Sequence, residues 1–227
     1  MRGFVFKYTA MNKDLIKYYH DRAKEYEKLY AKPERQQDLL QACTILQDVF
    51  TGKQLLEIAC GTGYWTEQLA KTATSILATD INSAVIEIAK QKDYGTGNVN
   101  LEVIDIYKMG NTKKHESLFG GFIWSHILLQ ELDRFIDTVN ELVKPGGLVV
   151  MMDNVYVEGN NHPITETDEH GNTYQTRKLE DGTPHIVLKN FPSDAFLKEQ
   201  LKGKATDIQI INLPYYWILT YKTLGNE

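Results

Sequence analysis

The sequence is poor in cysteine, in uninterrupted apolar runs and in the signals of an exported protein. Its 227 residues include two cysteines, Cys43 and Cys60, which form no C-x-x-C pair. This count argues against a zinc site and a disulfide framework, and free thiols are typical of a reducing compartment. No apolar run approaches the roughly 18 residues of a membrane span, and no apolar core with a small-residue cleavage site opens the chain. We therefore expect a cytoplasmic protein with no membrane partner and no metal.

Basic charge is also scarce. Lys and Arg together number 25 against 30 Asp and Glu, which gives a formal net charge of −5. Proteins that bind a phosphate backbone usually carry a basic excess, so we expect no nucleic-acid partner and favour a small molecule. The chain does have 42% hydrophobic residues, enough for the core of one three-layer α/β unit. The composition leaves the oligomeric state open.

The stretch 54–66, Q-L-L-E-I-A-C-G-T-G-Y-W-T, predicts a strand, a tight turn and a helix. The run 55–58 is apolar apart from one glutamate, as in a buried parallel strand, and Trp65 and Leu69 stand at helical spacing. Between them, residues 59–63 are small. Glycine has no Cβ and reaches positive φ cheaply, so a ligand can approach such a turn closely. The N–H groups at the start of the following helix favour an anionic group there.

Short apolar strands and amphipathic helices alternate after this turn. The alternation predicts a doubly wound, mostly parallel α/β sheet. The further parallel strands are expected at Ser75–Thr79, Val99–Ile104, Phe119–Ser125 and Leu148–Met152. Two more, Asp207–Leu213 and Tyr215–Leu224, are expected to close the seven-stranded sheet as an antiparallel hairpin.

Polar side chains stand at or near the carboxyl ends of the parallel strands, where ligands of such sheets bind. They are Glu57, Asp80, Asp105, Ser125 and Asp153. Alternative roles stay open for each of them. Asp80 and Asp105 are also suited to capping the helix that follows, and Asp153 to starting the next loop.

The N-terminal part, residues 11–50, predicts two helices. The first is expected from Asn12 to about Tyr30 and carries Tyr19, Tyr26 and Tyr30 on one face. It is either an amphipathic helix laid over the sheet or a lid whose tyrosines and Arg22 reach a ligand. A proline ends this helix. The second has an expected buried stripe of Leu39, Leu40, Cys43, Leu46, Val49 and Phe50.

Residues 154–190 form a polar, turn-rich insertion after the fifth strand. Within it, Tyr174–Leu179 and Pro184–Leu188 flank the turn Glu180–Thr183 and predict a β-hairpin. Long connections of this kind are often lids or binding loops. We expect the insertion and the tyrosine-bearing helix to cover an acceptor pocket together. No linker interrupts the chain, so residues 1–227 are interpreted as one domain.

The order of these motifs resembles the class I S-adenosylmethionine-dependent methyltransferases over nearly the whole chain. The family's first turn reads acidic-x-Gly-x-Gly-x-Gly, and here it is Glu57-x-Ala59-x-Gly61-x-Gly63. Alanine at the first glycine position departs from the pattern, and it fits if its φ is negative. The other matches are the acidic–apolar pairs Asp80-Ile81 and Asp105-Ile106, Ser125-His126 after the fourth strand, and Pro145-Gly146-Gly147 before the fifth.

The resemblance implies S-adenosylmethionine as cofactor. Asp80 would accept from the ribose hydroxyls and Asp105 from the adenine amino group. Ile81 and Ile106 would enclose the adenine, and the turn would bind the methionine end. The residues expected to bind the cofactor are Tyr19, Arg22, Tyr26, Glu57, Ala59, Cys60, Gly61, Gly63, Asp80, Ile81, Asp105, Ile106 and Ser125.

The implied reaction is an in-line displacement at the sulfonium methyl group, with a small molecule as acceptor. Positioning is then the main task of the protein. An acceptor that must lose a proton needs a base, and His126 and Asp153 are the candidates by position. His126 could also simply end a strand. Cys60 is interpreted as a small turn residue rather than a nucleophile.

Two other functions stay open. An acidic residue about 20 positions after a glycine turn also occurs in nicotinamide-dependent oxidoreductases. That fingerprint requires a third small residue, however, and this chain has Thr66 there. The other alternative is a non-catalytic module that uses the nucleotide-binding fold as an interaction surface.

Overall fold

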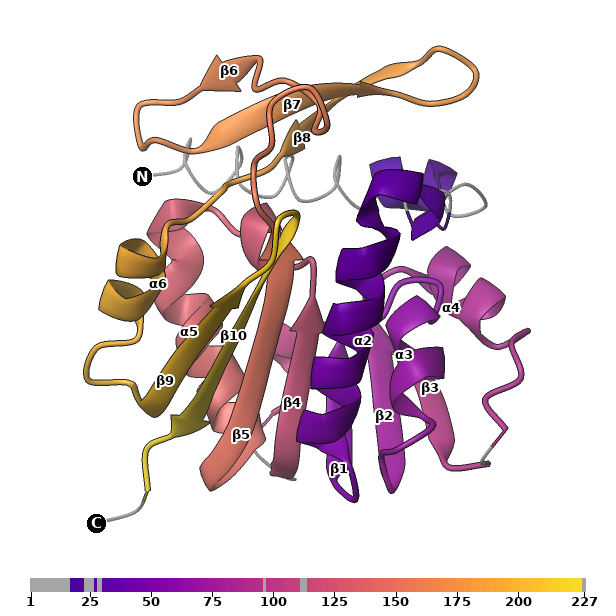
Figure 1. The fold of residues 1–227 in the computed structure, drawn as a ribbon, viewed down its shortest axis with the longest axis vertical. Helices are drawn as coiled ribbons and strands as arrows, with labels where there is room; N and C mark the ends of the chain where they lie inside the picture. The colour runs from indigo at the N-terminus through magenta and orange to yellow at the C-terminus, as the bar shows by residue number, and fades with distance from the viewer. Residues whose placement is uncertain (1–16, 23–26, 28–29, 96, 111–113, 226–227) are drawn as a thin grey trace.

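A seven-stranded sheet forms the centre of the molecule (Figure 1). The computed structural model describes residues 17–22, 27, 30–95, 97–110 and 114–225. The strand order is β3-β2-β1-β4-β5-β10-β9, with β1 to β5 parallel and β10 antiparallel to both of its neighbours. The strands are β1 (Gln54–Ile58), β2 (Ser75–Asp80), β3 (Val99–Val103), β4 (His115–Gly121), β5 (Val143–Asn154), β9 (Ala205–Asn212) and β10 (Tyr216–Thr223). The predicted seven-stranded, mostly parallel sheet is confirmed.

Helices cover both faces of this sheet. On one face lie α2 (Gln36–Phe50), α3 (Tyr64–Leu69) and α4 (Ser83–Ala89), which share a buried core with β1, β2 and β10. On the other face, α5 (Leu132–Leu142) and α6 (Asp194–Gln200) enclose a second core. Such layers form because each strand and each helix buries its apolar side chains. Short 3₁₀ helices occur at η2 (Pro33–Arg35), η3 (Ile106–Lys108), η4 (Trp124–His126) and η5 (Leu129–Glu131).

The first predicted helix does not run unbroken to Tyr30. Residues 17–21 are helical, Arg22 lies in a turn, and Tyr30 belongs to a 3₁₀ turn. The ring of Tyr30 stacks on Tyr64 with the centroids 3.7 Å apart. This packing against α3 is a tertiary contact that helical spacing does not reveal. Tyr26 lies outside the described residues.

The buried stripe of α2 also differs from the prediction at Leu40. That side chain is 71% exposed, whereas Ala42 and Asp38 are buried. Leu40 lies about 100° around the helix from Leu39, which faces the sheet. The carboxylate of Asp38 accepts a hydrogen bond from Tyr215 N at 2.8 Å, so a polar residue occupies part of the buried face.

The fourth strand lies four residues earlier than predicted, because polar residues occupy its beginning. Ser117 is buried in β4 and its hydroxyl donates to Gln54 O at 2.9 Å. At the other end, Phe122 has a φ of +59° and leaves the strand. The predicted apolar run therefore continues into η4 rather than into the sheet.

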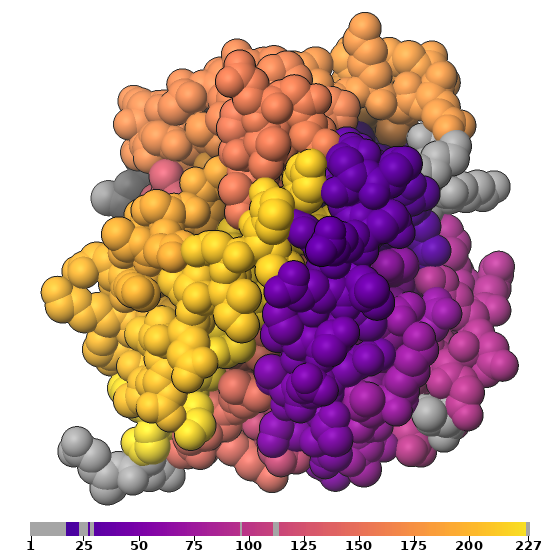
Figure 2. Space-filling model, viewed as in Figure 1, coloured from indigo at the N-terminus to yellow at the C-terminus, as the bar shows by residue number. Residues whose placement is uncertain are grey.

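A separate antiparallel sheet lies beyond the carboxyl ends of the parallel strands (Figure 1). It consists of β6 (Glu166–Thr167), β7 (Thr173–Lys178) and β8 (Pro184–Leu188), and β7 and β8 form the predicted hairpin. Figure 2 shows this segment covering one end of the molecule beside the start of α2. Among the described residues, no helix combines the length and the apolar character needed to cross a bilayer.

Candidate active site

The turn between β1 and α3 has its backbone N–H groups fixed by neighbouring strands. Cys60 N donates to Thr79 O and Gly63 N donates to Cys60 O, both at 3.0 Å. Gly61 N donates to the Asp80 carboxylate at 3.0 Å, which joins the turn to the end of β2. Gly61 and Gly63 have φ values of +57° and +81°, a region in which glycine is not strained.

Ala59 adopts a positive φ of +52°, so the negative φ under which alanine would fit this position is not present. The left-handed conformation is costly for a residue with a Cβ. Phe122 also has a positive φ, and both residues line the large cavity described next. Strained backbone of this kind concentrates at functional sites.

A large cavity of about 510 Å³ opens at the carboxyl ends of β1, β2, β3 and β4. Its volume is in the range of small-molecule sites. The structure brings together in its lining eight of the residues predicted from the sequence: Tyr19, Ala59, Gly61, Asp80, Ile81, Asp105, Ile106 and His126. Asn82, Val85, Ile104, Tyr107 and Phe122 also line it and were not singled out in the sequence.

Asp80 and Asp105 both cap local backbone and face the large cavity. The Asp80 carboxylate accepts from Gly61 N at 3.0 Å and from Asn82 N at 2.8 Å, and burial raises its pKa. The Asp105 carboxylate accepts from Tyr107 N at 3.1 Å and pairs with the Lys108 ammonium at 3.1 Å. A carboxylate has about four acceptor sites, so neither aspartate is saturated by these contacts.

Glu57, Cys60 and Gly63 lie behind the large cavity and do not line it. Glu57 is 2% exposed and accepts from the Thr66 hydroxyl at 2.7 Å, and burial raises its pKa to about 8. A protonated Glu57 therefore connects β1 to α3. Burial, with Glu57 and Asp80 nearby, also raises the pKa of Cys60, so its thiol stays protonated. This agrees with the interpretation of Cys60 as a turn residue.

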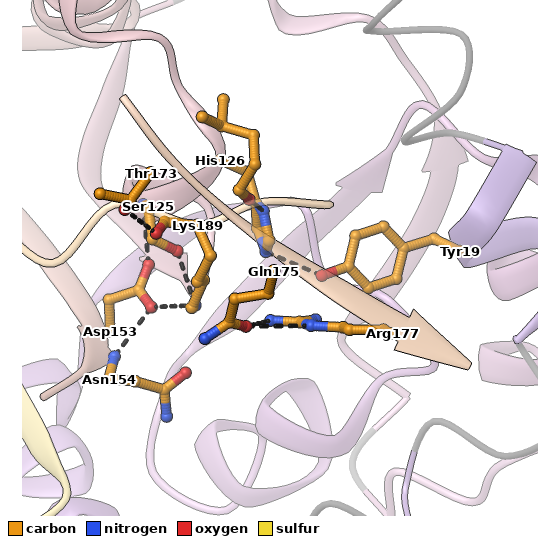
Figure 3. A network of polar contacts seen from close by, with 10 residues as sticks. Tyr19, Ser125, His126, Asp153, Asn154, Thr173, Gln175, Arg177 and Lys189 are labelled. Carbon is orange, nitrogen blue, oxygen red and sulfur yellow. Dashed lines mark hydrogen bonds and ion pairs between the residues drawn. The ribbon is translucent and has the colours of Figure 1, made fainter. Parts of the chain in front are cut away.

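Asp153 is not placed to act as a base, because it is fully buried, lines neither of the two cavities of this site and pairs with the Lys189 ammonium (Figure 3). It accepts from Lys189 Nζ at 2.7 Å, Ser125 N at 3.0 Å and Asn154 N at 2.8 Å. Burial raises the pKa of Asp153, but Lys189 outweighs this and holds the pKa below its usual range. Ser125 is buried in the same network, where its hydroxyl accepts from Lys189 at 2.6 Å. Sequence reasoning placed both residues against a ligand, whereas they support Lys189.

His126 is held as one neutral tautomer (Figure 3). Its Nδ1 lies 2.6 Å from Leu188 O, which only accepts, so Nδ1 carries the proton. Its Nε2 then accepts from the Tyr19 hydroxyl at 2.7 Å. Burial, together with the charges of Lys189 and Arg177, lowers the pKa of His126 to about 3.

A small cavity of about 100 Å³ adjoins the large one. Tyr19, Phe122 and His126 line both cavities. Arg22, expected at the cofactor, lines only the small cavity. Tyr30, one of the tyrosines of the possible lid, also lines it, as does Asn154 at the start of the insertion. Sequence reasoning did not single out the remaining lining residues, namely Lys32, Arg35, Asn160, Asn161, His162, Gln175, Arg177, Lys189 and Tyr216.

Some residues that line the small cavity do have a recognisable pattern in the sequence. Gln175 and Arg177 alternate along β7 and so share one of its faces. Lys189 directly follows the apolar end of β8, in the same way that Asp80 ends β2. Lys32 and Arg35 carry no such signal, because they lie in a short irregular connection.

Comparisons with known proteins agree on the class of fold. A family model described as a methyltransferase domain matches residues 55–147. An uncharacterized methyltransferase of Oceanobacillus iheyensis is 27% identical over 114 residues, which are 49% of this chain and 53% of that protein. The chain thus spans about half the length of this curated relative.

Solved structures extend the similarity to nearly the whole chain. The DhpI–SAH complex superposes with a TM-score of 0.78 at 24% identity and covers 95% of this chain and 98% of DhpI. The DhpI–SAM–HEP complex gives the same TM-score at 25% identity, with 93% and 97% covered. The likeness therefore includes the N-terminal segment and the insertion as well as the central sheet.

Proposed function

We propose that this chain, which is similar to S-adenosylmethionine-dependent methyltransferases in sequence and fold, transfers the methyl group of S-adenosylmethionine to a small acceptor molecule. One observation carries this proposal. Asp80, Asp105 and the glycine turn, which are separate in sequence, line one cavity at one edge of the sheet. Asp80 can accept hydrogen bonds from the ribose, and Asp105 can accept from the adenine amino group. The glycine turn beside them leaves space for the methionine end.

In this proposal the large cavity holds the cofactor. Ile81 and Ile106 would enclose the adenine, Asp80 would accept from the ribose hydroxyls, and the backbone of the turn near Gly61 would lie against the methionine end. The exposed side chain of Ile81, at 43%, gains burial when the adenine covers it. Glu57, Cys60, Gly63 and Ser125 act through the turn and the strands rather than by contact.

The acceptor occupies the small cavity. Tyr19, Phe122 and His126 line both cavities, so the transferred methyl group crosses beside them. Bound cofactor supplies an electrophilic sulfonium methyl group, and the protein's residues align the acceptor with it. His126 holds the Tyr19 hydroxyl at this boundary through its unprotonated Nε2. The insertion and the segment around Tyr19 cover the acceptor.

Several observations support a small acceptor. The small cavity has room for only a few atoms, and the formal net charge of −5 disfavours a nucleic-acid substrate. DhpI, similar in fold, has been solved in complex with both SAM and HEP. Neither an oxidoreductase nor a non-catalytic module is favoured by the comparisons.

Calorimetric titration with S-adenosylmethionine, S-adenosylhomocysteine and NADH tests the proposal. We expect the first two to bind and NADH not to bind. Asp80→Ala is expected to weaken binding of both by at least tenfold, because the ribose loses its acceptor and Gly61 N loses its partner. Asp93→Ala, at an exposed loop carboxylate, serves as the control. Binding of NADH alone, or of none of the three ligands, would contradict the proposal.

A further inference from the structure

The small cavity carries an excess of positive charge. Its lining includes the side chains of Arg22, Lys32, Arg35, Arg177 and Lys189, and no aspartate or glutamate among the described residues. The large cavity differs, because Asp80 and Asp105 face into it beside its two cationic side chains. In a protein of net negative charge, cations gathered around one small volume indicate a specific ligand rather than a general surface charge.

Two of these cations are buried guanidinium groups. Arg177 is 9% exposed and Arg35 is 7% exposed. The Arg177 guanidinium donates to Gln175 Oε1 at 3.1 Å through Nε and at 2.7 Å through a terminal nitrogen (Figure 3). The Arg35 guanidinium donates to Asn160 Oδ1 at 2.8 Å through Nε, and it lies 5.2 Å from the ring centroid of Tyr215.

These partners are neutral, so they orient the guanidinium groups without balancing their charge. Within the described part of the chain, neither arginine has a carboxylate at ion-pair distance. The nearest acidic side chains on the same segment are engaged elsewhere, since Glu34 accepts from Asn160 and Asp38 accepts from Tyr215 N. A buried charge is costly unless an opposite charge compensates it. The site is therefore built to receive an anion.

Neighbouring titratable groups respond to the same positive field. Burial lowers the pKa of Lys32, and Arg35 lowers it further. Burial also lowers the pKa of His162, and Arg177 and Arg22 add to this effect. Lys189 differs from the two arginines, because Asp153 compensates its charge at 2.7 Å.

We propose that the methyl acceptor carries an oxyanion, a carboxylate or a phosphate-type group, which Arg35 and Arg177 bind in the small cavity. This inference rests on the proposed function. Guanidinium groups match the geometry of both oxyanions because their N–H donors form a planar fork. The cavity of about 100 Å³ holds roughly three water molecules at ~30 Å³ each. That space suits a single anionic group, with the rest of the acceptor reaching toward Tyr19 and His126.

Calorimetry on the protein saturated with S-adenosylhomocysteine tests the inference. Acetate, inorganic phosphate and the neutral analogue acetamide are titrated separately at constant ionic strength. We expect acetate or phosphate to bind at least tenfold more tightly than acetamide, and the stronger of the two anions identifies the acceptor's head group. Equal affinity for all three probes, or no binding of either anion, would overturn the inference.

Variants assign the anion to the two arginines. Arg177→Met and Arg35→Met are each expected to weaken anion binding at least tenfold, while the affinity for S-adenosylhomocysteine changes less than twofold. Arg177→Lys keeps the charge but not the fork, so an intermediate loss is expected. Lys178→Met removes the exposed cation next to Arg177 on β7 and serves as the matched control. If it weakens anion binding as much as Arg177→Met does, the attraction is non-specific and the inference fails.

The two proposals fail in different ways. If wild-type protein binds no S-adenosylhomocysteine, the proposed methyl transfer itself is wrong. If it binds S-adenosylhomocysteine but shows no preference for anions, methyl transfer stands and the oxyanion acceptor is wrong. Intact circular dichroism and retained S-adenosylhomocysteine binding identify the variants that are folded. Arg35→Met tests the site independently should Arg177→Met be unstable.

Discussion

Single residues carry the features that distinguish this site from a plain nucleotide-binding fold. Ala59 and Phe122 adopt left-handed backbone conformations, and both border the large cavity. The first replaces a glycine of the family pattern, so a side chain is tolerated where the backbone does not favour one. The second turns the chain out of β4 and brings its ring to the boundary between the two cavities.

Ala59→Gly is expected to raise the free energy of unfolding by about 0.5–1 kcal/mol. Relief of the strained φ of +52° outweighs the extra freedom that glycine gives the unfolded chain. Urea denaturation measures the change. Ala42→Gly, within the regular helix α2, is the control and is expected to lower stability by about 1 kcal/mol or more. A loss of stability in Ala59→Gly would show that the Ala59 methyl group has a packing role that exceeds the strain.

At the scale of elements, a buried side-chain hydrogen bond joins β1 to α3 on either side of the glycine turn. Glu57 on β1 accepts a hydrogen bond from the Thr66 hydroxyl on α3 at 2.7 Å. Glu57 is 2% exposed. The pKa of about 8 means that the folded protein keeps a proton which the unfolded chain releases near 4.5. The stabilisation from this proton is complete below about pH 4.5 and is lost as the pH rises through 8.

Glu57→Gln is expected to be more stable than wild type at pH 8, by about 2 kcal/mol or more, because glutamine stays neutral. The difference should shrink steadily toward pH 5. Urea denaturation of the cofactor-free protein across this range measures it. Glu199→Gln, on the exposed surface of α6, should show no such trend. A difference that does not vary with pH would contradict the raised pKa of Glu57.

The small sheet is the second element on which the proposed function depends. Its strand β8 ends at Leu188, whose carbonyl orients His126, and β7 contributes Gln175 and Arg177. The far turn, residues 179–183, lines neither cavity. Ile186 and Leu188 of β8 also line the large cavity. The sheet should therefore matter most for the acceptor and less for the cofactor.

Replacing residues 165–188 by a short glycine–serine linker should abolish methyl transfer to the true acceptor. Binding of S-adenosylhomocysteine, measured by calorimetry, should weaken because Ile186 and Leu188 are lost, but it should remain detectable. Shortening only the turn 179–183 is the control and should leave both properties unchanged. Full turnover in the larger deletion would exclude the small sheet as a cover for the acceptor.

At the scale of the whole molecule, the buried His126 makes the free energy of unfolding depend on pH in the acid range. His126 has a pKa of about 3 when folded, below its ordinary 6.5. The unfolded chain takes up a proton first as the pH falls, so the stability present above pH 6.5 decreases toward pH 3. This group connects the main sheet, the small sheet and Tyr19, and its protonation should loosen all three together.

His126→Gln should lose less stability than wild type between pH 7 and pH 5. The expected difference is up to about 2 kcal/mol, from roughly 1.5 pH units at 1.36 kcal/mol each. Thermal unfolding in buffers of equal ionic strength measures it. His170→Gln, in a partly exposed turn of the insertion, should follow the wild-type profile. Parallel profiles for wild type and His126→Gln would show that His126 titrates normally.

Much of the architecture could be predicted because its signals are local. Alternating apolar runs predicted the parallel strands, and strand-end carboxylates predicted the edge at which Asp80 and Asp105 meet. Boundaries were less predictable where polar residues occupy a strand, as at Ser117, or where an apolar residue faces solvent, as at Leu40. The single-domain organisation over residues 1–227 and the cytoplasmic location stay predictions.

The sequence by itself determined the sheet and the edge at which Asp80 and Asp105 meet, because a strand-turn-helix motif and its acidic partners act within one or two neighbouring elements. Only the tertiary structure decided the small cavity. Arg22, Lys32 and Arg35 come from the N-terminal part of the chain, and Arg177 and Lys189 come from the insertion. More than a hundred residues separate the two groups, and no sequence periodicity relates them. In the folded protein Arg35 and Arg177 line the same cavity. Asp153 does not line that cavity, and its carboxylate pairs with Lys189. The proposed anionic acceptor rests on charge balance in three dimensions, which a chain read in order does not contain.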